Sequence, residues 1–408
     1  MVSEPSVKKV IFLTENSFGS SLGGLEQHIF HLARGMAERG FQVKILALRV
    51  GGASSFERRE VSTPTARFTV EEYVRFNPLF FLTSFLNKYV SGRIGLLPSL
   101  LEKLLPNLHL RVLLRRVKEI DPTIIHQHDY FSNIVLTKFL ARRWPVIFTN
   151  HTGQYLFLEK FRLTRWFQKF LLWHFDAVIG PSYELTPKND RSIFIPNGVD
   201  VNFFSGIKSD SGERLVVICP RRWAPTKGVR YLAEALTMLS PEDQQKLIVR
   251  FAGSDSNDYP WYAKEVMDIL RSLPENTYEL LGSLDQNQLR DEYLRSDVVV
   301  IPSLMEATSL AAMEGMSCGL PVLSTNVGGM PDVVVSPLIG WLVEPRDSAA
   351  LRDALSSIIA NRSVLGTMGA EARNFVLAER SWDKISERTL LVYDDVIQDR
   401  RPRLSKSG

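Results

Sequence analysis

Short runs of aliphatic and β-branched residues alternate with longer segments of helical periodicity along most of the chain, and this alternation limits the fold more than any other feature. Strands that alternate with helices form βαβ units, in which neighbouring strands are parallel. Several of the runs are apolar throughout, as expected for strands that helices cover on both faces. The pattern therefore predicts an α/β fold built on doubly wound parallel sheets.

Twelve runs have the length and composition of strands. They are residues 8–16, 41–48, 123–129, 145–151, 176–182 and 192–198 in the first half, and 214–222, 247–255, 278–283, 297–303, 320–326 and 340–345 in the second. The first helix is expected to begin after Gly23-Gly24 and to stop at Gly40, because apolar residues recur between them at helical spacing.

A chain of 408 residues exceeds one comfortable hydrophobic core. The polar, glycine-containing stretch 203–212 has the composition of a linker. We therefore expect two Rossmann-like, doubly wound domains, residues 1–203 and 204–382, that face each other across a cleft. Residues 383–408 follow as a final helix and a disordered tail.

Composition excludes several classes of protein. The net charge of +4, from 49 Lys and Arg against 45 Asp and Glu, is too small to indicate nucleic-acid binding. The two cysteines form no CxxC motif, so neither a disulfide framework nor a zinc site is expected. The apolar run at the N-terminus is too short for a signal peptide, and no stretch is long and apolar enough to span a bilayer. A cytoplasmic protein fits these features.

The unusual polar residues and glycines follow the predicted strands. In open α/β sheets, ligands bind at the carboxyl ends of the strands, so this placement indicates a cleft enzyme. The residues are Gly23 and Gly24, His126 and His128, His151, Asn197, Arg222 and Lys227, Gly253, and Glu306.

Two glutamates flank a predicted helix start. Ser309 is a favourable N-cap, and Gly319 is placed to end the helix. The free N–H groups of such a terminus suit a phosphate or diphosphate. Glu306 and Glu314 are poor phosphate ligands but good acceptors for vicinal hydroxyls, one for a ribose and one for a sugar. The alternative is two solvated carboxylates at a helix start.

Basic residues follow the first strand of the second half. Arg222 and Lys227 lie in the loop "PRRWAPTKG" and could neutralise a leaving diphosphate without a metal ion. The alternative is a solvated basic loop. No Asp-x-Asp motif is present, so a Mg²⁺ or Mn²⁺ bridge is not expected, and no other cofactor is indicated.

Histidines end two strands of the first half. Strand alternation places His126 and His128 on one face, and with Asp129 they resemble part of a metal cluster. A third and a fourth ligand at sensible spacing are missing, so no metal site is predicted. His128 is expected to line the acceptor side. His151 is a candidate for the reaction centre, with a structural histidine as the alternative.

Residues 68–118 and 157–175 combine apolar and aromatic residues with Lys and Arg. Basic amphipathic segments can lie on an anionic membrane, which an enzyme with a lipid-linked acceptor needs. The alternative is two segments that pack their apolar faces into the first domain. A peripheral position at the inner face of a membrane is therefore one hypothesis.

Six motifs, in order, resemble glycosyltransferase family 4, whose members are retaining, nucleotide-sugar-dependent enzymes of the GT-B fold. They are "GGLEQHIFHLARGMAERGFQV", "IIHQHD", "FTNHT", "IPNGVD", "PRRWAPTKG" and "PSLMEATSLAAMEGMSCGLPV". The last is similar to the family's E-x7-E segment, the most specific of the set. In this fold the C-terminal helix crosses back to the N-terminal domain.

The resemblance implies a role for each candidate residue. Arg222 and Lys227 would hold the donor diphosphate, Glu314 the ribose, and Glu306 the hydroxyls of the transferred sugar. The amides of Ser309 and Leu310 would cap the phosphates, and Gly23, Gly24 and Gly253 would take part in donor binding. His151 would lie beside the sugar. His128 and Asn197 would lie on the acceptor side.

Departures from the family pattern concern the donor sugar. Ala307 stands where the family usually has glycine, and Pro220 stands where a glycine usually precedes the arginine. The expected activity is metal-independent transfer of a hexosyl-type sugar, with retention, from an NDP-sugar such as a UDP- or GDP-sugar to a hydroxyl of a glycan, lipid-linked or small-molecule acceptor. The alternatives are a sugar phosphorylase or synthase of the same fold, or a non-catalytic, membrane-associated protein that binds nucleotide-sugars.

Overall fold

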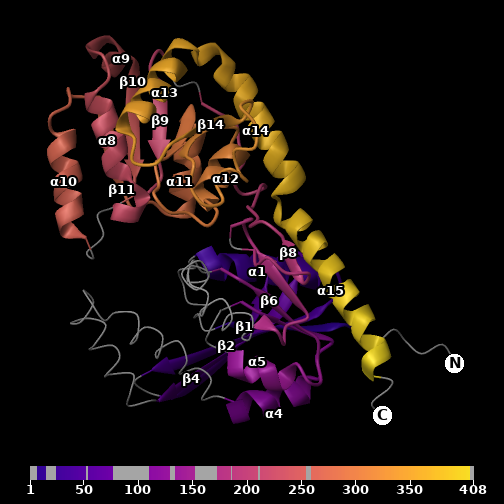
Figure 1. The fold of residues 1–408 in the computed structure, drawn as a ribbon. Coiled ribbons are helices and arrows are strands. Elements are labelled where there is room, and N and C mark those ends of the chain that lie inside the picture. Colours follow the sequence, from indigo (N-terminus) through magenta and orange to yellow (C-terminus); the bar gives the residue numbers. More distant parts are fainter. Residues whose placement is uncertain are drawn as a thin grey trace. The chain divides into compact units, whose positions relative to one another are not determined.

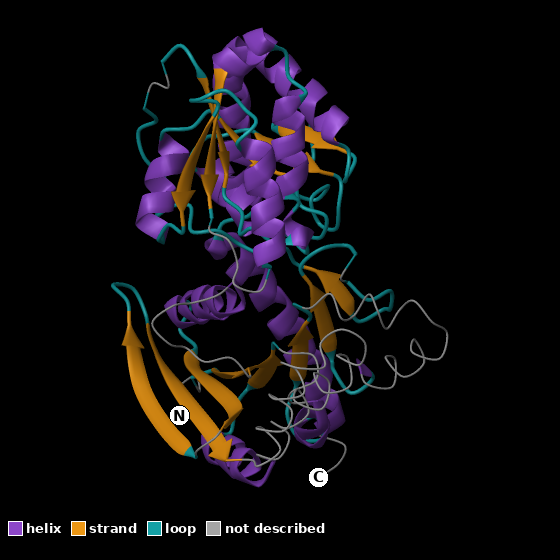
Figure 2. Cartoon of the chain, turned by 90° about the vertical axis from the view of Figure 1, so that its left-hand side faces the viewer, coloured by secondary structure: helices purple, strands orange, loops and turns teal. Residues whose placement is uncertain are grey.

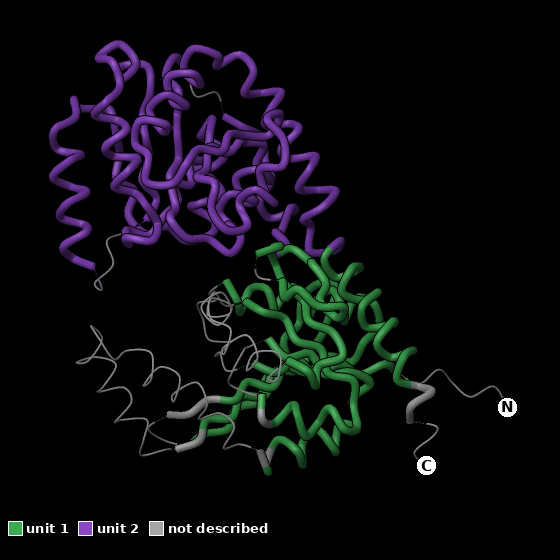
Figure 3. The backbone as a smooth tube through the Cα atoms, viewed as in Figure 1, with its two compact units in different colours: residues 1–196, 385–408 green, residues 197–384 purple. Residues whose placement is uncertain are grey.

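The computed structural model describes residues 7–14, 24–51, 54–76, 110–128, 134–151, 172–184, 186–209, 212–253 and 259–404 (Figure 1). The chain forms two compact units: unit 1 comprises residues 1–196 and 385–408, and unit 2 comprises 197–384. Each unit is an α/β domain with strands and helices in alternation (Figure 2). The predicted ranges 1–203, 204–382 and 383–408 stay predictions, and the division into units is drawn in Figure 3.

Unit 1 contains an eight-stranded sheet in the order β3-β4-β2-β1-β5-β6-β7-β8. All neighbouring strands are parallel except β3 and β4, which are antiparallel. The six strands that the sequence predicts are all present. The strands are β1 Lys9–Thr14, β2 Gln42–Gly51, β3 Ser55–Ser62, β4 Arg67–Phe76, β5 Ile124–Gln127, β6 Val146–Thr149, β7 Ala177–Gly180 and β8 Ser192–Phe194.

Strands β3 and β4 were not predicted, and β4 takes up the start of the basic segment 68–118. Helix α4 forms the end of that segment, from residue 110 on. Residues 77–109, between β4 and α4, lie outside the described residues. Of the second basic segment, residues 157–171 also lie outside it. The described helices of unit 1 are α1 Gly24–Glu38, α4 Leu110–Ile120 and α5 Ile134–Leu140.

Unit 2 contains a six-stranded, all-parallel sheet in the order β11-β10-β9-β12-β13-β14. Counted within the unit this is the order 3-2-1-4-5-6 of a dinucleotide-binding fold, with a switch point between β9 and β12. The strands coincide with the six predicted for this half: β9 Leu215–Cys219, β10 Leu247–Ala252, β11 Tyr278–Gly282, β12 Val298–Ile301, β13 Val322–Thr325 and β14 Gly340–Val343.

Both faces of this sheet are buried, as the apolar runs predict. In β12, Val298 and Val300 belong to one hydrophobic cluster, whereas Val299 and Ile301 belong to another on the opposite face. The helices of the unit are η2 Pro225–Lys227, α8 Val229–Thr237, α9 Pro241–Lys246, α10 Pro260–Leu270, α11 Gln286–Leu294, α12 Leu310–Ser317, α13 Ser348–Ala360, η3 Arg362–Val364 and α14 Leu365–Glu379.

The last helix, α15 Trp382–Leu404, begins in unit 2 and belongs to unit 1 from Ile385 on. Its anchors in unit 1 include Tyr393, whose hydroxyl lies 2.7 Å from Nδ1 of His126, and Arg400, whose Nε donates to Asp176 at 2.7 Å. The prediction that the C-terminal helix crosses back to the N-terminal domain is therefore confirmed. Among the described residues, no helix is both long and apolar enough to cross a membrane.

Candidate active site

The switch point of unit 2 brings together the two loops that leave β9 and β12. The amide of Leu304 donates to the carbonyl of Thr226 at 2.8 Å, which ties the loops to each other. Gly228 makes this approach feasible: its φ is +65°, and a Cβ there would lie 1.8 Å from the carbonyl oxygen of Pro302. The close approach of the two loops therefore requires a glycine at position 228.

Two cations and one carboxylate form a charge cluster at this point, made of Arg221, Lys227 and Glu306. Oε1 of Glu306 lies 2.7 Å from Nζ of Lys227 and 3.1 Å from Nη2 of Arg221. The side chain of Glu306 is only 8% exposed, and those of Arg221 and Lys227 are 10% and 24% exposed. A carboxylate that is buried to this extent requires such partners to remain ionised.

The electrostatics of Glu306 follow from these contacts. Burial alone would raise its pKa, but the charges of Arg221 and Lys227, with hydrogen bonds from Lys227 and Ser303, hold the pKa below its ordinary value. Glu306 is therefore ionised near neutral pH, and the cluster carries one net positive charge.

The N-terminus of α12 adjoins the charge cluster. Ser309 is the N-cap, and its Oγ accepts from the amide of Ala312 at 3.3 Å and also from Nη2 of Arg221. Nε of Arg221 is buried and has no hydrogen-bond partner in the described part of the chain. Gly253, after β10, lacks the Cβ that would lie 2.2 Å from the carbonyl oxygen of Arg221. These features hold a guanidinium against a helix N-terminus, which suits an anion.

Glu314 lies farther along α12 and is buried, at 8% exposure. The Tyr293 hydroxyl lies 3.2 Å from its Oε2 and 3.0 Å from the carbonyl oxygen of Ala311. Burial raises the pKa of Glu314 to about 7, although the hydrogen bond from Tyr293 and the charge of Arg221 oppose this shift. Without a ligand, Glu314 therefore takes both protonation states near neutral pH.

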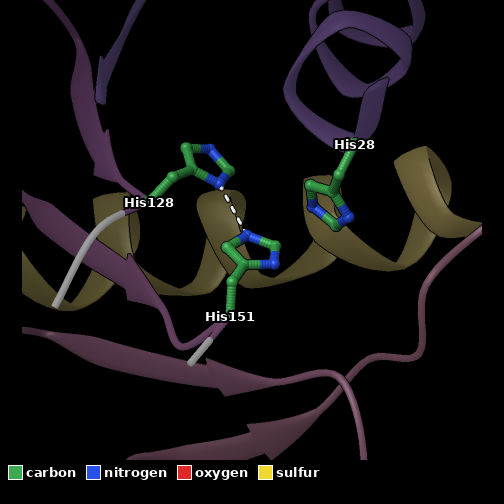
Figure 4. Close-up of side chains that lie close together, drawn as sticks. All are labelled: His28, His128 and His151. Atoms are coloured by element: carbon green, nitrogen blue, oxygen red, sulfur yellow. Dashed lines mark hydrogen bonds between the residues drawn. The ribbon is translucent and has the colours of Figure 1, made fainter. Parts of the chain in front are cut away.

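Unit 1 has its own switch point, between β1 and β5, and three histidines meet there (Figure 4). We call His28, His128 and His151 the histidine cluster. His28 lies on α1, His128 follows β5, and His151 follows β6. Nδ1 of His128 is 3.1 Å from Nε2 of His151, and the rings of His28 and His151 have centroids 4.5 Å apart.

Burial explains the charge state of these rings. It lowers the pKa of His128 and of His151 well below the usual value, and neighbouring imidazoles add to the effect. The ring of His126 is tilted against that of His128 at a centroid distance of 4.2 Å, but its two nitrogens already face Tyr393 and Thr149, at 2.7 and 2.6 Å. His126 is therefore a satisfied structural histidine.

The structure brings together part of the predicted donor set. Lys227, Glu306 and Ser309 meet at one point, with Leu310 as the first helical residue and Gly253 against the Arg221 carbonyl. Arg222 does not join them: it is exposed, and among the described residues its side chain makes no hydrogen bond or ion pair with the charge cluster. Its neighbour Arg221 occupies that place.

The other predicted residues lie apart from this set. Gly24 is exposed at the start of α1, and Gly23 lies outside the described residues, as does Asp129. His128 and His151 belong to unit 1, and Asn197 is the half-buried first residue of unit 2. Two residues were missed, Arg221 and His28.

A sequence signal existed for His28 but not for Arg221. His28 lies on the apolar stripe of α1 with Ile29 and Leu32, and a histidine on a buried stripe is unusual enough to note. For Arg221, two adjacent arginines offer equal chemistry. Only the fold shows that the side chain of Arg221 is the one that reaches Glu306 and Ser309.

Comparisons with known proteins agree with this geometry. Residues 22–203 match the family "Glycosyltransferase Family 4", and residues 203–375 match "Glycosyl transferases group 1". The chain is 27% identical, over 418 aligned residues, to a phosphatidylinositol N-acetylglucosaminyltransferase protein from Arabidopsis thaliana, covering 97% of this chain and 84% of the relative.

One further relative and one solved structure extend the comparison. The D-inositol 3-phosphate glycosyltransferase of Geodermatophilus obscurus is 30% identical over 223 residues, which cover 50% of this chain and 47% of the relative. The structure of HepE from Anabaena in complex with UDP superposes with a TM-score of 0.71 and 18% identity, covering 95% of this chain and 100% of that one. That likeness establishes the shared GT-B fold.

Proposed function

The chain belongs to glycosyltransferase family 4, and on this premise we propose that it moves a hexosyl-type sugar from an NDP-sugar to a hydroxyl acceptor with retention at the anomeric carbon. The observation that carries the proposal is the charge cluster at the N-terminus of α12, which combines two cations with a dipole end at the switch point of unit 2. A diphosphate has the charge and the oxygens that such a site binds.

Donor binding is assigned to the residues that meet at this point. Arg221 and Lys227 bind the diphosphate, the free amides after Ser309 cap it, and Glu314 accepts from the ribose hydroxyls. Glu306 accepts from hydroxyls of the sugar. Two cations at the diphosphate supply the positive charge that a leaving group needs, so no divalent metal is required at this position.

The proposed reaction exchanges one bond at the sugar. The bond between the anomeric carbon and the diphosphate oxygen breaks, and the acceptor oxygen bonds to the same face of that carbon. The acceptor proton passes to the departing diphosphate. Because Arg221 and Lys227 stabilise the charge that develops on the diphosphate, most of the rate acceleration is expected to be electrostatic.

A thermal-shift panel in EDTA tests the donor site without an acceptor. We expect one of UDP, GDP, ADP, dTDP and CDP to raise the melting temperature, since a ligand at 100 times its dissociation constant stabilises by about 2.7 kcal/mol. Lys227→Met should abolish the shift. Lys246→Met, at an exposed lysine paired with Glu242 in the same unit, should retain it. If none of the five nucleotides shifts the wild type, the donor assignment is wrong.

Glu306→Gln separates transfer from nucleotide binding. The substitution removes the carboxylate that now occupies Lys227 and Arg221, so the nucleoside diphosphate should bind at least as tightly as in the wild type. Transfer should fall by about 10²-fold or more, because the sugar hydroxyls lose their acceptor. Equal losses in binding and transfer would contradict a sugar-side role for Glu306.

For the acceptor, we propose a lipid-linked or inositol-type hydroxyl compound, by analogy with the names of the Arabidopsis and Geodermatophilus relatives. The described part of the second basic segment supports a membrane surface: Trp173 is 62% exposed, and Nζ of Lys138, on the neighbouring helix α5, lies 5.9 Å from its ring centroid. Sedimentation with vesicles tests this. Binding to phosphatidylinositol-containing but not to phosphatidylcholine vesicles, weakened in Trp173→Ser, is expected. No preference for anionic lipid would refute it.

A further inference from the structure

The histidine cluster has the arrangement of a metal site. His28, His128 and His151 come from one helix and from the ends of two strands, and each offers a ring nitrogen within 4.8 Å of the other two. Figure 4 shows the three rings directed toward a common space. The sequence alone offered His126 and His128 and lacked a third and a fourth ligand. In the fold His128 is joined instead by His28 from α1 and by His151 after β6.

The surroundings of the rings favour a cation. His128 and His151 face each other with stacked rings, and the three groups that converge are all imidazoles, whose nitrogen lone pairs are metal ligands. Nε2 of His128 is buried and has no hydrogen-bond partner among the described residues. Nδ1 is the nitrogen of His128 that faces His151, so it is the atom that would bind a cation, and Nε2 would then carry the ring proton.

We propose that His28, His128 and His151 bind one divalent transition-metal ion, with Zn²⁺ as the best match. Tetrahedral zinc with bonds of about 2.0–2.1 Å holds its nitrogen ligands about 3.3 Å apart. The His128–His151 pair, at 3.1 Å, already has this separation, and the third nitrogen is within side-chain adjustment of it. Three protein ligands leave a fourth position for water or a substrate oxygen.

The ligand set also selects against other ions. Neutral imidazoles suit zinc, copper and nickel, whereas Mg²⁺ and Ca²⁺ prefer carboxylate oxygens, of which this set has none. His126 is excluded as a ligand because both of its nitrogens are engaged. The site lies in unit 1, so it is distinct from the charge cluster of unit 2, which binds its diphosphate without a metal.

Metal binding is measured on the full-length protein without a histidine tag. After equilibrium dialysis against Zn²⁺, elemental analysis should give one zinc per chain, and Co²⁺ in its place should give the visible absorption of a tetrahedral site. His28→Ala and His128→Ala should each lose the metal. His31→Asn should retain it, since His31 is a half-buried histidine on the same helix outside the cluster.

The proposal can fail independently of the proposed function. No zinc retained by the wild type, or equal zinc in the wild type and both cluster variants, overturns the metal site. A far-UV circular dichroism spectrum like that of the wild type, with cooperative thermal unfolding in EDTA, shows that unit 1 of each variant is folded, and the nucleotide-induced melting shift reports on unit 2. A normal nucleotide shift without zinc binding would overturn the metal site and leave the glycosyltransferase proposal intact.

Discussion

Binding of the nucleotide-sugar is expected to weaken as the pH falls from about 8 to about 6, because Glu314 must be ionised to accept hydrogen bonds from ribose hydroxyls. Burial raises the pKa of Glu314 to about 7. A group with that pKa is about nine-tenths ionised at the upper pH and about one-tenth ionised at the lower. Since the apparent dissociation constant varies inversely with the competent fraction, it should rise about tenfold, or about 1.4 kcal/mol.

Isothermal titration calorimetry with an intact nucleotide-sugar measures this effect cleanly. Its diphosphate is esterified at both ends, so the ligand itself does not titrate in the range used. Glu314→Gln is the matched control, since it keeps the shape of the side chain and removes the ionisation. The variant should bind more weakly at every pH, with a constant that does not change with pH. A flat profile in the wild type, or the same slope in the variant, would refute the reasoning.

The same raised pKa makes the stability of the unliganded protein fall with rising pH, whereas binding of the nucleotide-sugar strengthens. Folding favours the protonated form of Glu314, so its contribution to stability is present below the ordinary pKa of 4.5 and is lost as the pH rises through about 7. The melting temperature of the unliganded wild type should therefore fall over this range relative to Glu314→Gln, while the shift caused by the nucleotide-sugar grows. A fall in the melting temperature together with a growing ligand-induced shift, both absent in Glu314→Gln, would identify Glu314 as the titrating group.

Two further substitutions test the packing that holds the sites. A non-glycine residue in the left-handed conformation lowers the free energy of unfolding by about 1–2 kcal/mol. Gly228→Ala should lower it by more than this, because the new Cβ would lie 1.8 Å from the Pro302 carbonyl oxygen. At Gly212, whose φ is +69°, a Cβ would have no non-neighbouring atom of the described residues within 4 Å, so Gly212→Ala should lose only that amount; equal losses in urea unfolding would contradict the argument. Tyr393→Phe leaves Nδ1 of His126 without its partner and should lower unfolding free energy by about 1–3 kcal/mol; an unchanged denaturation midpoint would show that this hydrogen bond is dispensable.

The sequence predicted the parallel strands because they are apolar on both faces, and it missed β3 and β4 for the converse reason. In β3, Glu57, Arg58 and Glu60 interrupt any alternation of apolar residues, because most of this edge strand is exposed. In β4, Glu71 is fully buried and is held by Arg116, whose Nη2 donates to it at 2.6 Å. A buried ion pair between residues 45 positions apart gives no local signal, so the segment resembled a basic amphipathic stretch.

The candidate site also combines features that the sequence indicates with features that only the packing shows. Motif spacing assigned Lys227, Glu306 and Ser309 to the ends of two strands, and these residues lie together in the structure because the carboxyl ends of adjacent parallel strands meet at one edge. It assigned the diphosphate to Arg222, whereas Arg221 is the arginine that reaches Glu306 and Ser309 in the structure. Sequence position therefore indicated the region of the candidate site, and only the packing showed which side chains enter it.

Desolvation acts at both switch points, but with opposite results. In unit 2 the carboxylate of Glu306 lies within 3.1 Å of a guanidinium, so burial leaves the charges in place and the site remains positive. In unit 1 the neighbours of His128 are other imidazoles, so burial and mutual repulsion remove the protons. A site of the first kind binds anions, whereas one of the second kind offers lone pairs to cations or to hydroxyl donors. The ligands proposed for the two switch points, a diphosphate in unit 2 and a metal or hydroxyl compound in unit 1, therefore differ because the groups within hydrogen-bond distance differ.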